Sequence, residues 1–309
     1  MNGDRQAITV MGLGSMGSAL AATLLDSGHP LTVWNRSVSK AQPLADRGAR
    51  LAATPEEAIS ASPLIITCVL DYDALHSVLD PVADALTGKA LVNLTSGSPE
   101  QAQEAVTWAR SHGIDYVDGA IMTTPPGVGS PEMMFLYSGS PAAFETHRPT
   151  LAALGDPLYL GSDPGLASLY DAALLGLMWS TMTGWLHGAA LVGAEQTPAT
   201  EFTPVAVRWL TAVAGFLTTY AVQVDAGRYP GDDATVDVQI AAIDHLIHAA
   251  ALRGVDNALP ELLRTAMQRA KAAGHGSDSY ASLIEVLRIP MQGTPAGLSP
   301  TRPRRDDAV

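Results

Sequence analysis

The longest apolar stretch of the chain, Gly165 to Glu195, restricts the possible folds more than any other segment. Between Ala172 and Ala194 it contains no charged residue and no proline, which indicates one helix that is apolar on nearly every side. At roughly 1.5 Å per residue this helix would be on the order of 45 Å long, more than one small domain can cover. We therefore expect other parts of the chain, or a second subunit, to pack around it.

A membrane span is the first alternative for this stretch, because an uncharged run of this length is long enough to cross a bilayer. The run contains Ser180, Thr181, Thr183 and His187 together with several glycines, and no Lys or Arg flanks it to set an orientation. The pattern therefore favours a helix of a soluble protein, and no membrane partner is expected.

Asp171 is the one acidic residue within this helix, and it lies close to the start. Its neighbours on the same helical face are Leu175, Met178, Trp179 and Met182. A carboxylate bordered by large apolar side chains is a candidate catalytic group. The alternative is that Asp171 only complements the positive end of the helix dipole.

Length, charge and cysteine content narrow the class of protein. A chain of 309 residues predicts about two domains, and a net charge of −13 disfavours nucleic acid and anionic membranes as partners. The single cysteine, Cys68, excludes an intrachain disulfide and suits a cytoplasmic location, and no export signal is apparent.

His245 and His248 have no third ligand at metal spacing, so we predict no metal site.

A glycine-rich segment, GLGSMG, follows the apolar run from Ala7 to Met11 and precedes an Ala- and Leu-rich helical pattern. In such a strand, turn and helix, Gly12 allows the tight turn, Gly14 lets the backbone approach a pyrophosphate, and Gly17 lets helix and strand pack closely. The first amide groups of the helix would face the phosphates. We therefore predict a dinucleotide site formed by Gly12, Leu13, Gly14, Ser15, Met16 and Gly17.

The residues that follow the second predicted strand, 31–34, indicate which dinucleotide binds. An NAD-binding protein is expected to have an acidic residue here, whereas this chain has Asn35, Arg36, Ser37 and Lys40. An Arg and a Lys with a hydroxyl between them suit a 2′-phosphate. The pattern favours NADPH or NADP+ as the cofactor, with a solvated basic turn as the alternative.

Strand-like and helical segments alternate up to residue 161, which predicts an α/β Rossmann-type domain with a largely parallel sheet. The further strand-like segments are 64–70, 90–94, 115–120, 133–138 and 158–160, and Thr54-Pro55 and Ser98-Pro99 mark helix starts. The cofactor crevice should lie at the carboxyl ends of the strands. Residues expected there are Val69, Leu70, Asn93, Thr95 and Met122, and the Pro- and Gly-rich loop 121–131, which contains Thr124, is expected to face the substrate.

After residue 162 the pattern becomes helical, with apolar residues at helical spacing in 204–226, 234–253, 260–273 and 279–287. We divide the chain into a Rossmann-type NADP-binding domain (1–162), a long interdomain helix (163–195), an all-α C-terminal domain (196–293) and a Pro-rich, charged tail (294–309) that we expect to be disordered. Because few helices are available to cover the interdomain helix, we expect an obligate dimer.

Several segments together resemble the bacterial NADPH-dependent imine reductases, which are relatives of the β-hydroxyacid dehydrogenases. The segments are GLGSMG, VWNRSVSKA, NLTSGSP, GAIMTTPP, SLYDAALLGLMWSTMTGWLHGAALV, DAGRYPGDDATVDVQIAAIDHL and AAGHGSDSYASLIEVLR. The resemblance covers nearly the whole chain apart from the tail. It implies a reciprocally swapped homodimer, with each active site between the nucleotide domain of one subunit and the helical domain of its partner.

The resemblance also implies roles for single residues. Asp171 holds the position of the family's acidic or tyrosine catalytic residue, and Asn93 that of a residue near nicotinamide and substrate. The substrate-pocket positions would be Leu175, Trp179, Trp209, Val238 and Gln239, the last three from the partner, and we add Met122, Thr124, Met178 and Met182 from their places in the sequence. Without the resemblance, such apolar side chains are core residues more often than pocket walls.

This chain departs from the wider superfamily in the charge that it places on the connecting helix. The β-hydroxyacid dehydrogenases keep a lysine on the connecting helix to stabilise an alkoxide, whereas Lys40, Lys89 and Lys271 all lie elsewhere in this chain. An anion such as Asp171 instead favours a protonated imine, which is positive at nitrogen before hydride arrives. We expect reduction of imines or iminium ions to amines, including imines formed from a ketone or aldehyde and an amine. A carbonyl-reducing relative and a non-catalytic NADPH-binding regulator remain alternatives.

Overall fold

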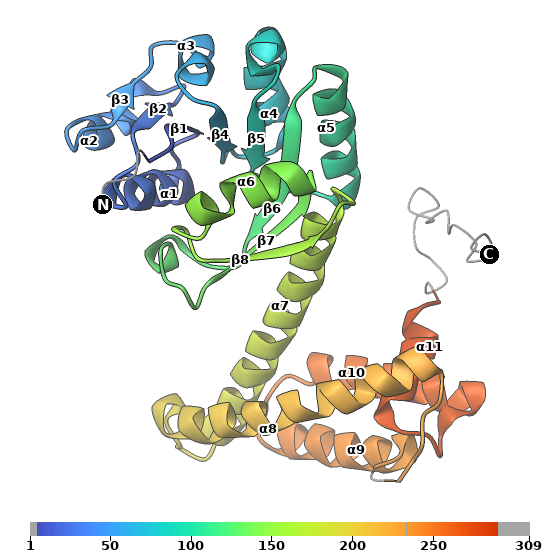
Figure 1. The fold of residues 1–309 in the computed structure, drawn as a ribbon. Helices are drawn as coiled ribbons and strands as arrows, with labels where there is room; N and C mark the ends of the chain where they lie inside the picture. Colours follow the sequence, from blue (N-terminus) through green and yellow to red (C-terminus); the bar gives the residue numbers. More distant parts are fainter. Residues whose placement is uncertain (1–4, 233, 290–309) are drawn as a thin grey trace, which may run out of the picture. The chain divides into compact units, whose positions relative to one another are not determined.

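The computed structural model describes residues 5–232 and 234–289, so the predicted tail, 294–309, lies outside the described residues. The chain divides into two compact units, Met1–Met178 and Trp179–Val309, which we describe one at a time. The first unit contains the sheet and the helices that cover it, and the second is helical (Figure 1).

The first unit is built on an eight-stranded sheet in the order β3-β2-β1-β4-β5-β6-β7-β8. The strands are β1 (Ile8–Met11), β2 (Leu31–Trp34), β3 (Arg50–Leu51), β4 (Leu64–Thr67), β5 (Ala90–Asn93), β6 (Asp115–Ile121), β7 (Met134–Gly139) and β8 (Asp156–Gly161). Neighbouring strands are parallel except β6 and β7, which are antiparallel. The strand order reverses at β1 and β4, where the fold places a ligand crevice beyond the carboxyl ends of the strands.

Two details of the sheet differ from the prediction. β3 has only two residues and was not predicted, because so short a strand carries no pattern. β4 ends at Thr67 and not at Leu70. The chain leaves the sheet at Cys68, where the carbonyl oxygen lies so close to Gly12 that a Cβ there would be 2.3 Å away.

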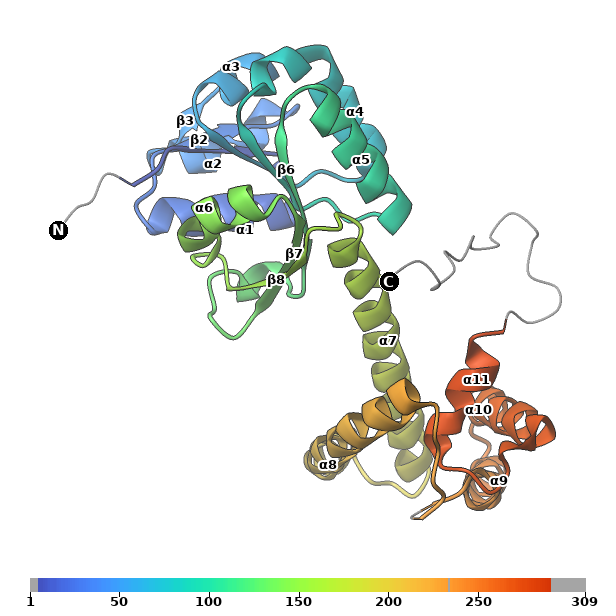
Figure 2. The same ribbon diagram turned by 45° about the vertical axis from the view of Figure 1, so that its right-hand side comes forward.

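Helices cover both faces of the sheet (Figure 2). One face carries α1 (Ser15–Asp26) and α6 (Pro141–Leu151), and the other carries α3 (Pro55–Ser60), α4 (Tyr72–Leu79) and α5 (Pro99–Ser111). The shorter elements are α2 (Gln42–Ala45), η1 (Val38–Lys40), η2 (Asp80–Leu86) and η3 (Pro125–Gly127). The predicted helix starts at Thr54 and Ser98 are confirmed, since both side chains accept a hydrogen bond from a backbone amide of the first turn.

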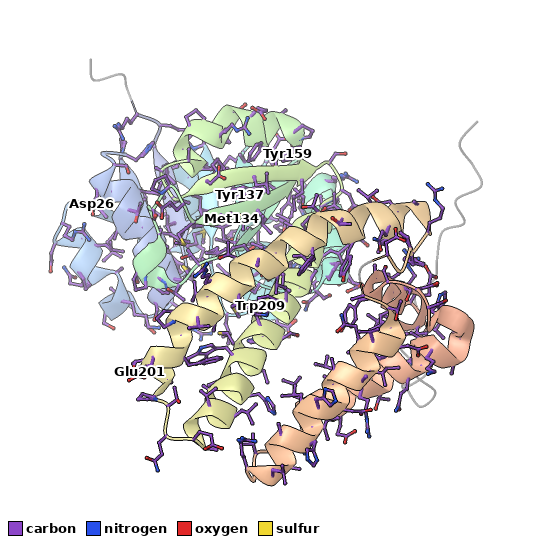
Figure 3. All side chains as sticks on the ribbon, turned by 90° about the horizontal axis from the view of Figure 1, so that it is seen from below. Asp26, Met134, Tyr137, Tyr159, Glu201 and Trp209 are labelled. Atoms are coloured by element: carbon purple, nitrogen blue, oxygen red, sulfur yellow. The ribbon has the colours of Figure 1, made fainter. Side chains whose placement is uncertain are left out.

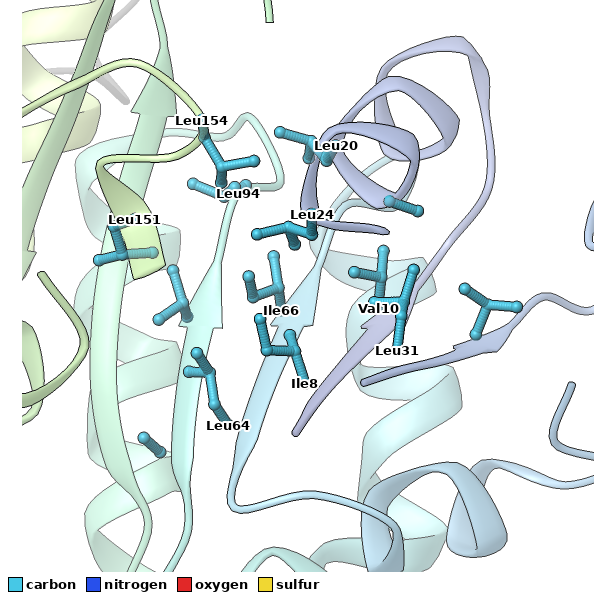
Figure 4. Close-up of a cluster of buried hydrophobic side chains, with 14 of the residues drawn as sticks. Ile8, Val10, Leu20, Leu24, Leu31, Leu64, Ile66, Leu94, Leu151 and Leu154 are labelled. Atoms are coloured by element: carbon cyan, nitrogen blue, oxygen red, sulfur yellow. The ribbon is translucent and has the colours of Figure 1, made fainter. Parts of the chain in front are cut away.

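The core between the sheet and α1 is formed by aliphatic side chains (Figure 4). Ile8 and Val10 of β1 and Ile66 of β4 are fully buried and pack with Leu20 and Leu24 of α1. Each such side chain contributes about 1.5 to 3 kcal/mol through burial. This packing holds the start of α1 at the carboxyl end of β1.

The predicted long helix is confirmed as α7 (Leu166–Gly193), whose residues up to Met178 belong to the first unit. The second unit continues with α8 (Ala199–Ala226), α9 (Val236–Leu252), α10 (Ala258–Ala270), η4 (Lys271–His275), η5 (Tyr280–Ser282) and α11 (Leu283–Leu287). The segments α9 to α11 share a small core that includes Val236, Ile243 and Met267. α8 begins before Pro204, where we had expected its start, and none of its residues is buried within this chain.

One helix of the described residues, α8, is long and apolar enough to cross a membrane by length and composition alone. The stretch that first suggested a span, now α7, does not meet that criterion. An apolar surface helix is also typical of a subunit interface, so α8 is weak evidence for a membrane.

Candidate active site

The glycine turn after β1 needs glycine at two positions for steric reasons. Gly12 has a φ of +95°, and a Cβ there would lie 2.3 Å from the Cys68 carbonyl oxygen. A Cβ on Gly17 would lie 1.9 Å from the Gly12 carbonyl oxygen, whereas one on Gly14 would meet nothing within 4 Å. Gly12 and Gly17 therefore make the turn possible, and Gly14 leaves open space in front of it.

The start of α1 differs from the starts of the helices α3, α4, α5 and α6. Side chains of Thr54, Asp71, Ser98 and Ser140 cap α3, α4, α5 and α6, whereas α1 has Gly14 at its N-cap and no side-chain cap hydrogen bond. The exposed backbone at residues 14–15 can thus offer amide donors and the positive end of the helix dipole to an anion. This arrangement fits the pyrophosphate of a dinucleotide.

The loop after β2 lies beside this turn. The Asn35 Oδ1 atom accepts a hydrogen bond of 2.9 Å from the Leu13 amide, and its Nδ2 atom donates one of 3.0 Å to the Ser37 carbonyl. Asn35 therefore joins the two loops. Arg36, Ser37 and Lys40 are exposed, and neither cation takes part in an ion pair found in the described part of the chain. These residues fit a 2′-phosphate.

The predicted residues beyond β4 and β5 divide into buried and exposed ones. Asn93 and Thr95 are buried, and the Thr95 Oγ1 atom accepts a hydrogen bond of 3.2 Å from the Val69 amide. Leu70 is exposed on the loop. Asn93 and Thr95 thus shape the edge of the crevice through hydrogen bonds within the protein.

The residues predicted on the substrate-facing side of the first unit lie after β6 and on α7. Met122 is partly buried against a small cluster formed by Ala120, Leu136 and Ala167, and Thr124 is exposed before η3. Leu175 is partly buried, and Met178 is 42% exposed. These side chains lie just beyond the end of β6 and on α7, and no hydrogen bond from any of them to another residue is found within the described ranges.

Asp171 lies in the second turn of α7 and is half-buried. Among the described residues, its carboxylate has no hydrogen-bond or ion-pair partner. Burial raises its pKa above the ordinary value. A half-buried carboxylate without a cation beside it is available to a cationic ligand.

A buried group that the sequence analysis missed lies beneath the start of α7. Asp118 of β6 is fully buried, and its carboxylate accepts hydrogen bonds from Tyr72 (2.9 Å), Tyr116 (3.3 Å) and Ser168 (2.8 Å). Burial raises the pKa of Asp118 to about 6, against the effect of these three donors. The only signal in the sequence was one acidic residue in the middle of an apolar strand.

The raised pKa of Asp118 predicts a pH-dependent stability. Because the pKa of the folded state, about 6, exceeds the ordinary value of 3.8, the folded protein holds this proton more tightly than the unfolded chain. The resulting stability is present below the ordinary value and is lost as pH rises through the folded-state value. From about pH 4 to about pH 7, the free energy of unfolding should therefore fall by about 2 kcal/mol relative to Asp118→Asn, which cannot titrate.

Urea unfolding of both proteins at several pH values, followed by circular dichroism, measures this difference. A difference that stays constant between the two pH limits would contradict the assignment.

Of the predicted pocket residues of the second unit, Trp209 lines an apolar groove between the C-terminal half of α7 and α8. Its cavity volume is about 360 Å³, and Trp185, Phe202 and Trp209 are among the lining residues. Trp209 projects from α8 (Figure 3) and is 63% exposed. Trp179 and Met182 of α7 and Val238 of α9 are also exposed, and Gln239 is partly buried beside Val238.

A mostly parallel sheet with a glycine turn and an uncapped helix start at its switch point defines the class of Rossmann-type, dinucleotide-binding proteins. Residues 7–161 match the NAD binding domain of 6-phosphogluconate dehydrogenase. Residues 163–289 match the C-terminal domain of NADPH-dependent reductive aminase-like proteins.

Individual relatives agree with these domain matches. The chain is 38% identical over 286 residues to the NADPH-dependent reductive aminase of Aspergillus oryzae. The alignment covers 91% of this chain and 97% of the relative. The structure of an imine reductase from Bacillus cereus has a TM-score of 0.86 and 38% identity, covering 93% of this chain and 100% of the other. The structure of a reductive aminase from Aspergillus terreus, in complex with NADPH4, cyclohexanone and allyl amine, has a TM-score of 0.85 and 40% identity. The match covers 92% of this chain and 99% of the other.

The chain belongs to the family of NADPH-dependent reductive aminases and imine reductases. The resemblance and the fold class inferred from the sequence are thereby confirmed.

Proposed function

We propose that this protein reduces imines or iminium ions to amines with NADPH, and that Asp171 is its catalytic residue. The observation that carries the proposal is the half-buried Asp171 carboxylate on α7, which has no partner among the described residues, in a chain of the reductive aminase family. A relative in this family has been solved with a ketone and an amine bound. We therefore propose small imines, or carbonyl compounds together with amines, as substrates.

The proposed cofactor site uses the residues that fit its phosphates. The glycine turn and the start of α1 would hold the pyrophosphate, and Arg36, Ser37 and Lys40 would hold the 2′-phosphate. When bound, NADPH supplies the hydride. Val69, Leu70, Asn93 and Thr95 would border its nicotinamide half, because they lie at or just beyond the carboxyl ends of β4 and β5.

The role proposed for Asp171 follows from its charge. A carboxylate stabilises the protonated, electrophilic form of an imine and orients its nitrogen. It would oppose the alkoxide that forms when a carbonyl is reduced. The charge on Asp171 therefore favours carbon–nitrogen over carbon–oxygen double bonds.

We also propose the domain division and the assembly. Residues 1–162 would bind the cofactor, 163–195 would connect, and 196–293 would dimerise and contribute to the substrate pocket. The absence of buried residues in α8 supports an obligate, swapped homodimer in which the partner supplies Trp209, Val238 and Gln239. The free Cys68 supports a cytoplasmic location.

The proposed dimer predicts a defined mass in solution. Sedimentation velocity should show a dimer, and Trp209→Glu combined with Leu217→Glu should shift it toward the monomer, because both side chains are exposed apolar residues of α8. Glu201→Gln, a substitution near the start of the same helix that we expect to leave the dimer intact, is the matched control. A wild-type protein that is monomeric and fully active would exclude the shared site.

The proposed 2′-phosphate site predicts a change in cofactor preference. Arg36→Ala combined with Lys40→Ala should weaken NADPH binding about 10-fold or more, the effect of losing hydrogen bonds to a charged group. NADH affinity should change little, because NADH has no 2′-phosphate. Fluorescence titration with both cofactors measures this, with Arg47→Ala as the control, since Arg47 pairs with Asp26. An equal loss for NADPH and NADH would contradict the site.

The test of the proposed activity compares substrates. NADPH oxidation with a cyclic imine, or with a ketone plus an amine, is expected, with the amine as product. NADPH oxidation with keto or aldehydo acids but with no imine would indicate a carbonyl reductase, and cofactor binding without turnover would indicate a regulator.

A further inference from the structure

The buried carboxylate of Asp118 has no part in the reaction proposed above, yet it touches the elements that carry both Asp171 and Asn93. We propose that Asp118 is a positioning residue of the imine-reducing site, which ties the helix that carries Asp171 to the strand edge that carries Asn93. This inference rests on the proposed function. Asp118 acts through Asp171 and is not itself in contact with the substrate.

The first connection runs to α7. The Ser168 hydroxyl donates a hydrogen bond of 2.8 Å to the Asp118 Oδ2 atom, and Ser168 is 5% exposed. Ser168 and Asp171 are three residues apart and therefore neighbours on one side of the helix. Ser138, which lies opposite Asp118 in the β6–β7 register, donates to the Pro164 carbonyl and accepts from the Ala167 amide. Two neighbouring side chains of the sheet thus fix the first turn of α7.

The second connection runs to β5. The Tyr116 hydroxyl donates a hydrogen bond to the Asp118 Oδ1 atom and accepts one of 3.0 Å from the Asn93 Nδ2 atom. The Asn93 Oδ1 atom accepts hydrogen bonds from the Thr67 hydroxyl and the Thr95 amide. These hydrogen bonds fix the orientation of the Asn93 side-chain amide, with Nδ2 as donor and Oδ1 as acceptor. The chain of bonds that sets this direction ends on Asp118.

Asp118 also brings a charge close to Asp171. The titratable groups that face Asp118 are Tyr72 from α4, Tyr116 from its own strand and Asp171 from α7. No Lys, Arg or His within the described ranges forms an ion pair with Asp118. With no cation between them, the two carboxylates repel, and the proton affinity of each depends on the charge of the other. The charge on Asp171 therefore adds to burial in raising the pKa of Asp118.

Asp118→Asn tests this role, because it keeps the shape of the side chain and an oxygen that can accept from Tyr72 and Tyr116, and it replaces the oxygen that accepts from Ser168 with an uncharged NH2 group that only donates. At pH 7 Asp118→Asn should lower kcat for a cyclic imine about 10-fold, the effect of losing hydrogen bonds to a charged group, and should cause no further loss in the Asp171→Asn background. Ser138→Ala is the matched control, since it removes the neighbouring tie to α7 without changing a charge. It should lower kcat less than Asp118→Asn does, because the hydrogen bonds of Ser138 involve no charged group.

A second readout does not depend on activity. Carbon-13 NMR of labelled aspartate carboxyl groups follows the titration of Asp118, whose signal is identified by its loss in Asp118→Asn. The titration midpoint should be lower in Asp171→Asn than in the wild type, because the charge of Asp171 raises the pKa of Asp118. Equal midpoints would overturn the inference, whereas a wild type that reduces no imine would overturn the proposed function and leave the NMR comparison to decide this one.

Ser168→Ala provides a variant with a smaller structural change if Asp118→Asn does not fold. Because Ser168 is proposed to act through Asp171, Ser168→Ala should lower kcat about 10-fold in the wild type, the effect of one lost hydrogen bond to a charged group. It should cause no further loss in the Asp171→Asn background. Losses that multiply in the double variant would show that the two residues act independently and would overturn the inference.

Discussion

Asp171→Ala is expected to lower kcat for imine reduction by roughly 100-fold or more, the effect of removing a charged group that stabilises the reacting centre. NADPH affinity should be retained, because the residues that fit the cofactor phosphates lie on the glycine turn and after β2, not on α7. Steady-state kinetics with a cyclic imine and fluorescence titration with NADPH measure the two quantities.

The pKa of Asp171 is raised by burial, so kcat/KM of the wild type should fall as the pH drops and this carboxylate is protonated.

The control for Asp171→Ala is Glu195→Gln, which removes a carboxylate just after the other end of α7. Glu195 pairs with Arg253 at the surface, where an ion pair contributes little to stability. Glu195→Gln should therefore retain both activity and stability. Unchanged activity in Asp171→Ala would remove Asp171 from the chemistry.

Gly17→Ala is expected to have the largest effect on folding. A Cβ at this position would lie 1.9 Å from the Gly12 carbonyl oxygen, so α1 and the turn must move apart. We expect the free energy of unfolding to fall by about 3 kcal/mol or more, the upper range for overpacking. Thermal and urea unfolding measure it.

Gly14→Ala is the matched contrast within the same turn. A Cβ at Gly14 meets nothing within 4 Å, so stability should change by less than about 1 kcal/mol. NADPH affinity should fall about 10-fold or more, because the methyl group would occupy the space in which the pyrophosphate approaches the backbone. Equal destabilisation by the two substitutions would contradict the separate roles of the two glycines.

The sequence was sufficient where a local pattern determines the structure. The glycine turn, the capping pattern at Ser98 and the uncharged run that became α7 each lie within one continuous segment, so spacing and composition identified them. The same reasoning cannot supply strand direction, because a buried strand has the same apolar pattern whether it runs parallel or antiparallel. β7 was therefore predicted as a strand without its antiparallel pairing.

The parts of the site that the sequence did not reveal depend on long-range contacts. Asp118 obtains its donors from Tyr72 and Ser168, which are 46 and 50 residues away along the chain. Asn35, which we predict to contact the cofactor, accepts a hydrogen bond from the Leu13 amide, 22 residues earlier, and the sequence did not reveal this pair. No local spacing encodes such pairs, so only the fold shows which polar residues are neighbours.

The most direct test of the account measures NADPH oxidation by the wild-type protein with a cyclic imine, and separately with a ketone that has no amine present, while the products are identified. The charge of Asp171 predicts rapid oxidation and amine formation with the imine, and little oxidation with the ketone alone. Oxidation with the ketone alone, and none with the imine, would contradict the claim that this carboxylate selects carbon–nitrogen double bonds.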